Sequence, residues 1–365
     1  MNQCILAWEF SQVYWDYVVI INFLKVKYIY LILRGFMKIV IVGKKNFLHW
    51  DDYVAEAFKK LGHNVHHFQI NKRPFLIKLF RGISKTILGK KIGNKVTDSI
   101  YAKKLTSKIK DIKPDLIFYT SASFIPEDFY KIASSCKSQP KVFAWDGDGG
   151  AAHPDNKYLS KYIDIFFDTE NEYVKLNPAN FKKVVNLPFC ANTHIYKDLK
   201  LERNNSFYIC GSLTQERDAI FSNLTDFNVI FKGYNWDKLS TKSQNFEIKI
   251  GTVGPEEQAI DYNSYIGVIN IHQASNNPFS ALNMRTFEAP ASNSLLISDC
   301  REGIEKYFEI GKEILCFKDT DELRKILSQL KQSPNSFNMV RDAGYKRAIK
   351  DHTYEARMRE VLSYI

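Results

Sequence analysis

Short apolar runs recur along the first half of the chain, and patterns typical of helices lie between them. The runs do not alternate strictly with polar residues, which is typical of parallel strands buried on both faces. They cover residues 38–42, 64–68, 115–119, 141–145, 164–167 and 183–187. Helical patterns occupy residues 52–61 and 126–135. Strands that alternate with helices predict a doubly wound parallel sheet.

A second series of the same kind begins after a polar, loop-like stretch at residues 190–205. Its apolar runs cover residues 206–210, 228–231, 266–271, 294–297 and 313–317. We therefore expect an α/β protein with two doubly wound parallel-sheet domains, at residues 37–190 and 200–350, that face a central cleft. Ligands of such sheets bind at the carboxyl ends of the strands, so we expect the functional site in that cleft.

The first 36 residues differ from the rest of the chain. Residues 13–33 are mostly apolar and aromatic, but Asp16, Lys25 and Lys27 interrupt them, and the longest run without a charge has eight residues. A membrane-spanning helix needs about 20 apolar residues. Met37, by contrast, leads directly into the first strand pattern. We interpret residues 1–36 as an extension before a natural start at Met37. A membrane-associating segment and an added structural element remain alternatives.

The basic charge is concentrated in one segment. The sequence has 51 Lys and Arg residues against 40 Asp and Glu, which is a net charge of +11. Thirteen basic and two acidic residues lie between Lys72 and Lys113, so this segment carries the whole excess. Its apolar residues have near-helical spacing, a combination that suits an anionic membrane surface. A solvated, lysine-rich helix face explains it equally well. Without a nucleic-acid-binding motif, we expect no nucleic acid partner.

Several functional classes are disfavoured by patterns that the sequence lacks. The first strand ends at Gly43 without a G-x-G-x-x-G pattern, and neither a P-loop nor a G-x-S-x-G pattern occurs. Dinucleotide oxidoreductases, P-loop enzymes and α/β-hydrolases are therefore disfavoured. The six cysteines lie far apart with no C-x-x-C pair. This indicates reduced core thiols in a cytoplasmic protein.

The residues best suited to chemistry lie between Asn270 and Asp299, where the pattern predicts strand, polar loop, short helix and strand. A helix beginning near Asn283 would direct backbone N–H groups at a phosphate. Arg285 would add a planar guanidinium that suits a diphosphate. Glu288 follows one turn later on the same face and would accept hydrogen bonds from ribose hydroxyls. A simple Arg285–Glu288 surface pair accounts for the spacing as well.

Four motifs resemble the C-terminal domain of the spore-maturation (CgeB-like) glycosyltransferases, which belong with the group 1 glycosyltransferases of GT-B architecture. In order, they are N-x-R-x-F-E-A from Asn283, F-E-x-G-K-E-I-L from Phe308, D-x-D-E-L from Asp319 and H-T-Y-E-x-R from His352. The resemblance covers roughly residues 206–365, whereas the first half matches in layout only. Asn293 stands where the family often has glycine, and asparagine is the next-best residue for left-handed backbone.

The resemblance implies two Rossmann-like domains, a nucleotide-sugar donor on the second and a glycan, lipid-linked or protein acceptor facing the first. It implies no cofactor and no obligatory metal, and we expect retention of configuration rather than inversion. The C-terminal helix, within residues 351–365, would return to the first domain. For His272, packing in the core is the stronger alternative to donor contact. The donor-binding residues that the resemblance implies are Gly211, Ser212, Arg217, Gly233, His272, Asn283, Arg285, Thr286 and Glu288, with Arg285 and Glu288 also catalytic.

In the first domain, Asp146, Asp148 and His153 follow the end of a strand. The D-G-D sequence matches the D-x-D metal clamp of a different glycosyltransferase architecture (GT-A), but it also forms turns readily. The donor motifs lie in the other domain, so we expect no metal site here. Asp146 or His153 is a candidate acceptor-side base or positioning residue, a role that only an inverting reaction requires. We also expect no metal at the three histidines His63, His66 and His67.

The sequence therefore predicts a cytoplasmic glycosyltransferase, peripheral at the inner face of the membrane, that serves cell-surface polysaccharide or glycoconjugate synthesis. The main alternative is a non-catalytic nucleotide- or glycan-binding module of the same architecture. A third hypothesis is another two-domain nucleotide enzyme, such as an oxidoreductase, which the missing glycine pattern disfavours.

Overall fold

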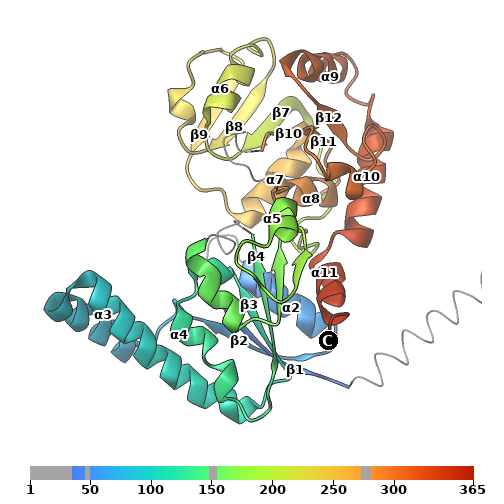
Figure 1. Ribbon diagram of the computed structural model, residues 1–365. Coiled ribbons are helices and arrows are strands. Elements are labelled where there is room, and N and C mark those ends of the chain that lie inside the picture. The colour runs from blue at the N-terminus through green and yellow to red at the C-terminus, as the bar shows by residue number, and fades with distance from the viewer. Residues whose placement is uncertain (1–34, 46–49, 148–153, 273–280) are drawn as a thin grey trace, which may run out of the picture.

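The computed structural model describes residues 35–45, 50–147, 154–272 and 281–365, and it consists of two α/β units (Figure 1). Each unit is built on a six-stranded parallel sheet with helices packed around it. The predicted fold class, two doubly wound parallel-sheet domains, is confirmed. The interpretation of residues 1–36 falls almost entirely on residues outside the described part of the chain.

The N-terminal sheet contains strands β1 (Lys38–Gly43), β2 (Asn64–Gln69), β3 (Leu116–Thr120), β4 (Lys141–Asp146), β5 (Ile165–Asp168) and β6 (Val184–Asn186). Their order across the sheet is β2-β1-β3-β4-β5-β6. The surrounding helices are α2 (Trp50–Lys60), α3 (Phe75–Ile112), α4 (Glu127–Tyr130) and α5 (Asn171–Leu176), with short 3-10 turns at Ala122–Phe124, Ala133–Ser135 and Pro154–Lys161. The chain reverses its direction of winding between β1 and β3.

The C-terminal sheet contains strands β7 (Asn204–Cys210), β8 (Val229–Gly233), β9 (Phe246–Ile250), β10 (Tyr265–Asn270), β11 (Leu296–Asp299) and β12 (Leu315–Phe317). Their order is β12-β11-β10-β7-β8-β9. Its helices are α6 (Gln215–Phe221), α7 (Pro255–Ser264), α8 (Arg285–Ala291), α9 (Thr320–Gln332) and α10 (Asn338–Asp351), with 3-10 turns at Trp236–Lys238 and Ile304–Lys306. A last helix, α11 (Tyr354–Leu362), follows α10.

Burial on both faces explains why the strands have continuous apolar runs. In β1, Ile39 and Ile41 pack into one hydrophobic core, whereas Val40 and Val42 pack into the core on the other face of the sheet. All four side chains are fully buried. The C-terminal sheet likewise separates two hydrophobic cores, so polar positions are excluded from the centre of either sheet.

Two of the four sequence motifs begin helices. Asp319 caps α9, where its carboxylate accepts a hydrogen bond of 2.8 Å from the backbone N–H of Glu322. Thr353 caps α11 in the same way, and its hydroxyl accepts from the N–H of Ala356 at 3.1 Å. Such side chains satisfy N–H groups that have no partner within the helix. These motif positions are therefore explained by helix capping.

Three expectations about the elements need correction. The single helix expected at residues 126–135 is divided, because the hydroxyls of Ser134 and Ser135 bond to the carbonyl of Lys131 and compete with helix continuation. The edge strand β9 was not predicted at all. Among the cysteines of the described residues, which are free thiols, Cys300 is exposed rather than part of the core.

Helix α11 packs against the N-terminal sheet although it ends the chain (Figure 1). Its residues Tyr354, Met358 and Val361 are buried in the same core as Ile39 and Ile41. Residues 187–203 form the linker between the two units. Arg357 donates hydrogen bonds to the linker carbonyls of Pro188 at 3.0 Å and Phe189 at 3.2 Å, and to the carbonyl of Asp351 at 3.2 Å. This one side chain therefore joins the linker, α10 and α11.

We expect Arg357→Met to destabilise the protein by about 3 kcal/mol, because three backbone carbonyls, one of them in a buried hydrogen bond, would lose charge-assisted hydrogen bonds. Arg359→Met, on the same helix but exposed, is the matched control and should change stability by less than about 0.5 kcal/mol. Urea unfolding followed by tryptophan fluorescence measures both. Equal midpoints for the two variants would contradict this role of Arg357.

Candidate functional site

A cavity of about 510 Å³ lies at the carboxyl edge of the C-terminal sheet. Its lining comes from the ends of β7, β8 and β9, from α7 and α8 and from the linker: Phe189, Cys210, Gly211, Ser212, Gly233, Tyr234, Gly251, Thr252, Val253, Gln258, Asn283, Met284, Arg285 and Glu288. A smaller cavity of about 230 Å³, near Arg203 and Arg341, lies at the amino ends of the strands. Doubly wound sheets bind ligands at the carboxyl edge, so the larger cavity is the candidate site.

Two glycines allow a close approach of the chain at this edge. Gly211 and Gly233 follow or end neighbouring strands and have φ angles of 131° and 134°. A Cβ atom on Gly233 would lie 2.1 Å from the carbonyl oxygen of Gly211. A Cβ on Gly211 would lie 2.9 Å from guanidinium nitrogens of both Arg217 and Arg285. Both positions therefore need glycine.

The guanidinium groups of Arg217 and Arg285 come together beside Gly211. Arg217 is buried and donates to the backbone carbonyls of Ser212 and Ile271. Burial, together with the charge of Arg285, lowers the pKa of Arg217 to about 10. Within the described residues, neither group forms an ion pair with a carboxylate. Arg285 lines the cavity, whereas Arg217 lies buried behind the wall and is not a lining residue, so together they place positive charge at a wall that is suited to an anion.

Asn270, at the end of β10, positions Arg285. Its amide oxygen accepts hydrogen bonds from Arg285 at 3.2 Å and from the side chain of Asn283 at 2.8 Å. Its amide nitrogen donates to the Thr286 hydroxyl at 3.3 Å. We did not expect this role from the sequence, where Asn270 was only the boundary of a motif. The signal that could have revealed it is a polar residue at the end of an apolar strand.

His272 and Thr286 lie behind the cavity wall rather than among its lining residues. His272 is buried, and its Nδ1 lies 2.6 Å from a carboxylate oxygen of Asp299. Its other ring nitrogen lies 3.3 Å from the Thr286 hydroxyl. The structure therefore places both residues in a network that continues through Asn270 to Arg285. Asp299 is a second member of this network that the sequence did not reveal. Burial raises the pKa of Asp299, but the hydrogen bonds from His272 and the charge of Arg301 outweigh it, so the pKa is lowered.

Glu288 lines the same cavity from the next turn of α8. Its side chain is buried, and burial raises its pKa to about 7, although Arg285 and a hydrogen bond from Tyr196 partly oppose this shift. No ion pair joins Arg285 and Glu288 in the described part of the chain, so the alternative of a simple surface pair does not describe this site. Glu288 is therefore poised between its charged and neutral forms near neutral pH.

The expectation that helix N–H groups point at a phosphate needs correction. The helix begins at Arg285, and α8 has only seven residues. The backbone N–H groups of Thr286 and Phe287 donate to the carbonyls of Asn283 and Met284 at 3.1 and 3.0 Å. Because these N–H groups already have partners, the positive centre in the cavity comes from the two arginine side chains.

The far side of the cavity is formed by the G-Y-N-W turn at residues 233–236, which resembles a turn of the glycosyltransferase family that borders the base, and by residues after β9 that the sequence did not single out. Tyr234 follows β8, and Gly251, Thr252 and Val253 follow β9, the strand that was not predicted. Below them, the indole N–H of the buried Trp236 donates to the carbonyl of Gly211 at 2.6 Å. The G-Y-N-W sequence after β8 thus supports the turn at Gly211.

Asp146, the one candidate residue of the N-terminal unit that the structure describes, is not among the residues that line this cavity. Asp146 ends β4, is fully buried, and accepts a hydrogen bond from the N–H of Gly147 at 3.1 Å. Asp148 and His153 lie outside the described residues. Gly147, which follows Asp146, lies against a residue that lines the cavity. A Cβ atom on Gly147 would be 2.3 Å from the ring of Phe189.

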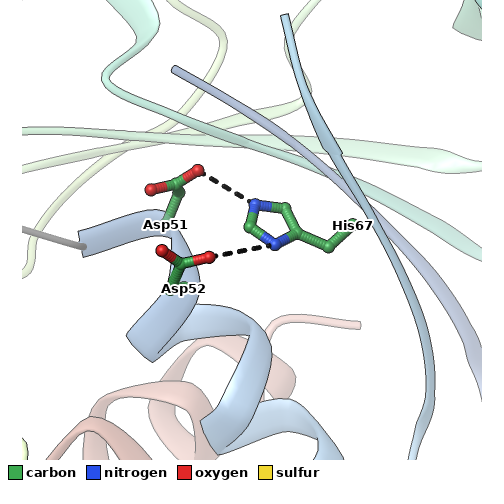
Figure 2. Close-up of side chains that lie close together, drawn as sticks. All are labelled: Asp51, Asp52 and His67. Carbon is green, nitrogen blue, oxygen red and sulfur yellow. Dashed lines mark hydrogen bonds and ion pairs between the residues drawn. The ribbon is translucent and has the colours of Figure 1, made fainter. Parts of the chain in front are cut away.

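The N-terminal unit contains one group with metal-ligand geometry, formed by Asp51, Asp52 and His67 (Figure 2). One ligand atom from each lies within 4.8 Å of the others. His67 Nε2 is 3.0 Å from Asp51, and Gln69 donates to both carboxylates at 2.8 and 3.1 Å. Although burial opposes ionisation of Asp51, these bonds lower its pKa. The sequence analysis expected no metal at His67 and missed its two acidic neighbours.

Comparison with known proteins gives one family match, and its range contains most of the residues that line the cavity. Residues 210–363 match a family model described as "Glycosyl transferase-like". Gly211, Arg217, Gly233, Arg285 and Glu288 all fall within this range. No curated protein gives a significant sequence match.

Solved structures share the fold of the whole described chain. Sucrose-phosphate synthase (tll1590) from Thermosynechococcus elongatus has a TM-score of 0.60 and 10% sequence identity, and the match covers 90% of this chain and 98% of that one. Anabaena Alr3699/HepE, in complex with UDP and glucose, has a TM-score of 0.55 and 11% identity over 90% and 100%. The lipopolysaccharide outer core galactosyltransferase WaaB has a TM-score of 0.58 and 12% identity over 90% and 100%.

Residues 210–363 therefore resemble a glycosyl transferase-like domain, and the described chain has the two-sheet GT-B fold of these solved structures.

Proposed function

We propose that this protein transfers a sugar from a nucleotide-sugar donor to a glycan, lipid-linked or protein acceptor. The observation that carries the proposal is the pair of guanidinium groups beside Gly211. Two like charges, of which Arg217 is buried and Arg285 partly exposed, repel each other, and a doubly charged diphosphate in the cavity would stabilise both. The match of residues 210–363 to a glycosyl transferase-like family supports this assignment.

The lining residues suggest how a donor would lie. The diphosphate would contact Arg285, with the charge of the buried Arg217 behind it, and the Glu288 carboxylate would accept hydrogen bonds from the ribose hydroxyls. The base would then lie toward Tyr234 and Thr252, and the sugar would face the N-terminal unit. The cavity volume of about 510 Å³ falls in the usual range for small-molecule sites. Anabaena HepE, which shares the fold, has been solved with UDP and glucose bound, which supports a nucleotide sugar here.

In the proposed reaction, the bond between the anomeric carbon and the phosphate oxygen breaks, and that oxygen keeps the electron pair. The acceptor hydroxyl forms the new bond to the anomeric carbon, and its proton passes to the departing phosphate. Arg285 and Arg217 would stabilise the negative charge that develops on the diphosphate. We include retention of configuration and independence from metal in the proposal. Glu288 is the only carboxylate among the described lining residues, and our donor pose uses it for the ribose.

A CgeB-like subfamily, a cytoplasmic location and a role in cell-surface glycoconjugate synthesis complete the proposal. They rest on the four motifs that begin at Asn283, Phe308, Asp319 and His352. The alternative, a module that binds a nucleotide sugar without turnover, would use the same cavity. Release of UDP during incubation with UDP-glucose and acceptor sugars separates the two hypotheses.

Arg285→Met should weaken binding of UDP-glucose at least 30-fold, because a charge-assisted interaction with phosphate is worth about 2 kcal/mol. Arg285→Lys should show an intermediate loss, since lysine keeps the charge without the planar pair of donors. Isothermal titration calorimetry measures both, with the exposed Arg359→Met as control. Unchanged affinity in Arg285→Met, in a protein with the wild-type melting temperature, would contradict the diphosphate site.

Donor affinity should depend on pH through Glu288. Its pKa of about 7 means that the carboxylate predominates at pH 8 and the neutral acid at pH 6. If only the carboxylate accepts hydrogen bonds from both ribose hydroxyls, the dissociation constant of UDP-glucose should rise as the pH falls through 7. The rise should approach tenfold per pH unit below 7. Glu288→Gln should bind more weakly at pH 8 and lose this dependence. A wild-type profile that is flat between pH 6 and 8 would contradict the assignment.

Treatment with EDTA should leave the rate of transfer unchanged, because the proposed site stabilises the diphosphate with arginines. The assay is UDP release before and after dialysis against EDTA, with added Mn²⁺ as the comparison. If activity is lost and Mn²⁺ restores it, metal independence is wrong. Asp51→Asn would then show whether the group of Asp51, Asp52 and His67 holds the ion.

A further inference from the structure

Helix α3 is a hairpin of two arms. Gly89 interrupts its helical backbone with φ 78° and ψ 159°, which separates residues 75–88 from residues 90–112. The arms touch directly, because a Cβ on Gly93 would lie 2.6 Å from backbone atoms of Ser84. Arg81 also donates to the side chain of Asn94 at 2.8 Å. In Figure 1 the hairpin projects from the N-terminal unit, away from the C-terminal sheet.

The second arm makes most of the hairpin's contacts with the core of the protein, and the first arm adds only Ile77 to that core. On the second arm, Tyr101, Ala102, Leu105 and Ile109 are buried in the core of the N-terminal sheet. On the first arm, by contrast, Ile77 and Ser84 are the only buried side chains. The first arm therefore leaves most of its surface without a partner in the described part of the chain.

The unpartnered surface of the hairpin is strongly apolar. Of the 19 large hydrophobic side chains exposed in the described residues, eight lie within this 18-residue stretch: Phe75, Leu76, Leu79, Phe80, Ile83, Ile87, Leu88 and Ile92. On the first arm, most of these hydrophobic residues are three or four positions apart, which places them along one face of the helix. Exposed apolar residues scattered singly need no explanation, but a contiguous group of this kind marks an interaction surface.

The same surface is basic. Thirteen Lys and Arg residues lie between Lys72 and Lys113 against two acids, and one of these acids, Asp98, is paired with the buried Arg73. Lys90, Lys91 and Lys95 are exposed beside the tip at Gly89. No helix in the described residues is long and apolar enough to cross a membrane.

We propose that the α3 hairpin docks the protein on the surface of an anionic lipid bilayer. Ile83, Ile87, Leu88 and Ile92 would enter the boundary between headgroups and acyl chains, while Lys90, Lys91 and Lys95 would contact anionic headgroups. A bilayer offers an apolar layer beneath an anionic one, which matches both features of the hairpin. Nucleic acid lacks the apolar layer, and a second copy of the chain would bring two basic segments together. The proposal does not depend on the donor chemistry.

The test uses the full-length protein in a flotation assay with vesicles. We expect binding to vesicles of phosphatidylcholine mixed with phosphatidylglycerol, weaker binding in raised salt, and little binding to phosphatidylcholine alone. Lys90→Glu with Lys91→Glu should weaken binding at least tenfold, since each basic residue near an anionic surface contributes a several-fold factor. Ile87→Ser with Leu88→Ser should weaken it similarly through the lost apolar contact.

Matched controls lie on α10, where Met339 and Ile349 are exposed apolar residues and Lys346 and Lys350 are exposed lysines. Met339→Ser with Ile349→Ser, and Lys346→Glu with Lys350→Glu, should leave vesicle binding unchanged. UDP-glucose affinity should be unchanged in the hairpin variants, which separates a failure of this proposal from a failure of the proposed function.

Three results would overturn the proposal. The first is no binding of the wild-type protein to the anionic vesicles. The second is binding that persists in both hairpin variants, which would assign the membrane contact to another segment. The third is RNA binding or self-association that the hairpin variants abolish while vesicle binding is absent, which would assign the hairpin to that partner.

Discussion

Two guanidinium groups are held side by side against the backbone at the carboxyl edge of the C-terminal sheet, and the surrounding geometry depends on this constraint. Arg217 and Arg285 repel each other, so each is held by neutral acceptors: backbone carbonyls for Arg217 and the Asn270 amide for Arg285. Gly211 has a φ angle of 131°, which favours glycine, and a Cβ there would lie 2.9 Å from both groups. Neutral acceptors keep the positive charge of the centre, whereas carboxylates would cancel it.

The fold could be predicted where burial determines the pattern of residues. Strands such as β1 and β10 are covered on both faces, so their apolar runs are continuous and recognisable. The strand β9 was missed because it lies at the sheet edge, where only Phe246 and Ile248 pack against the core and exposed polar residues alternate with them. The helix at residues 126–135 was overextended because serine hydroxyls that bond to a nearby carbonyl are not visible in a hydrophobic pattern.

In the candidate site, only contacts between residues that are close in the sequence could be predicted. Arg285 and Glu288 are one helical turn apart, so the sequence alone places them on one face. The support for Arg285 comes instead from Asn270, which is 15 residues away at the end of β10, and the network continues to Asp299 at the end of the neighbouring strand β11. The group around His67 likewise joins residues 15 and 16 positions apart. Such contacts depend on which strands become neighbours in the sheet, and a single sequence does not reveal the order of the strands.

The position of α11 has a consequence for how the chain is made. Tyr354, Met358 and Val361 complete a core whose other members include Ile39 and Ile41, so the first and last parts of the described chain fold together. During synthesis the N-terminal sheet leaves the ribosome long before this helix and waits with an uncovered apolar face. A truncation that removes α11 would therefore damage the half of the protein that is translated first.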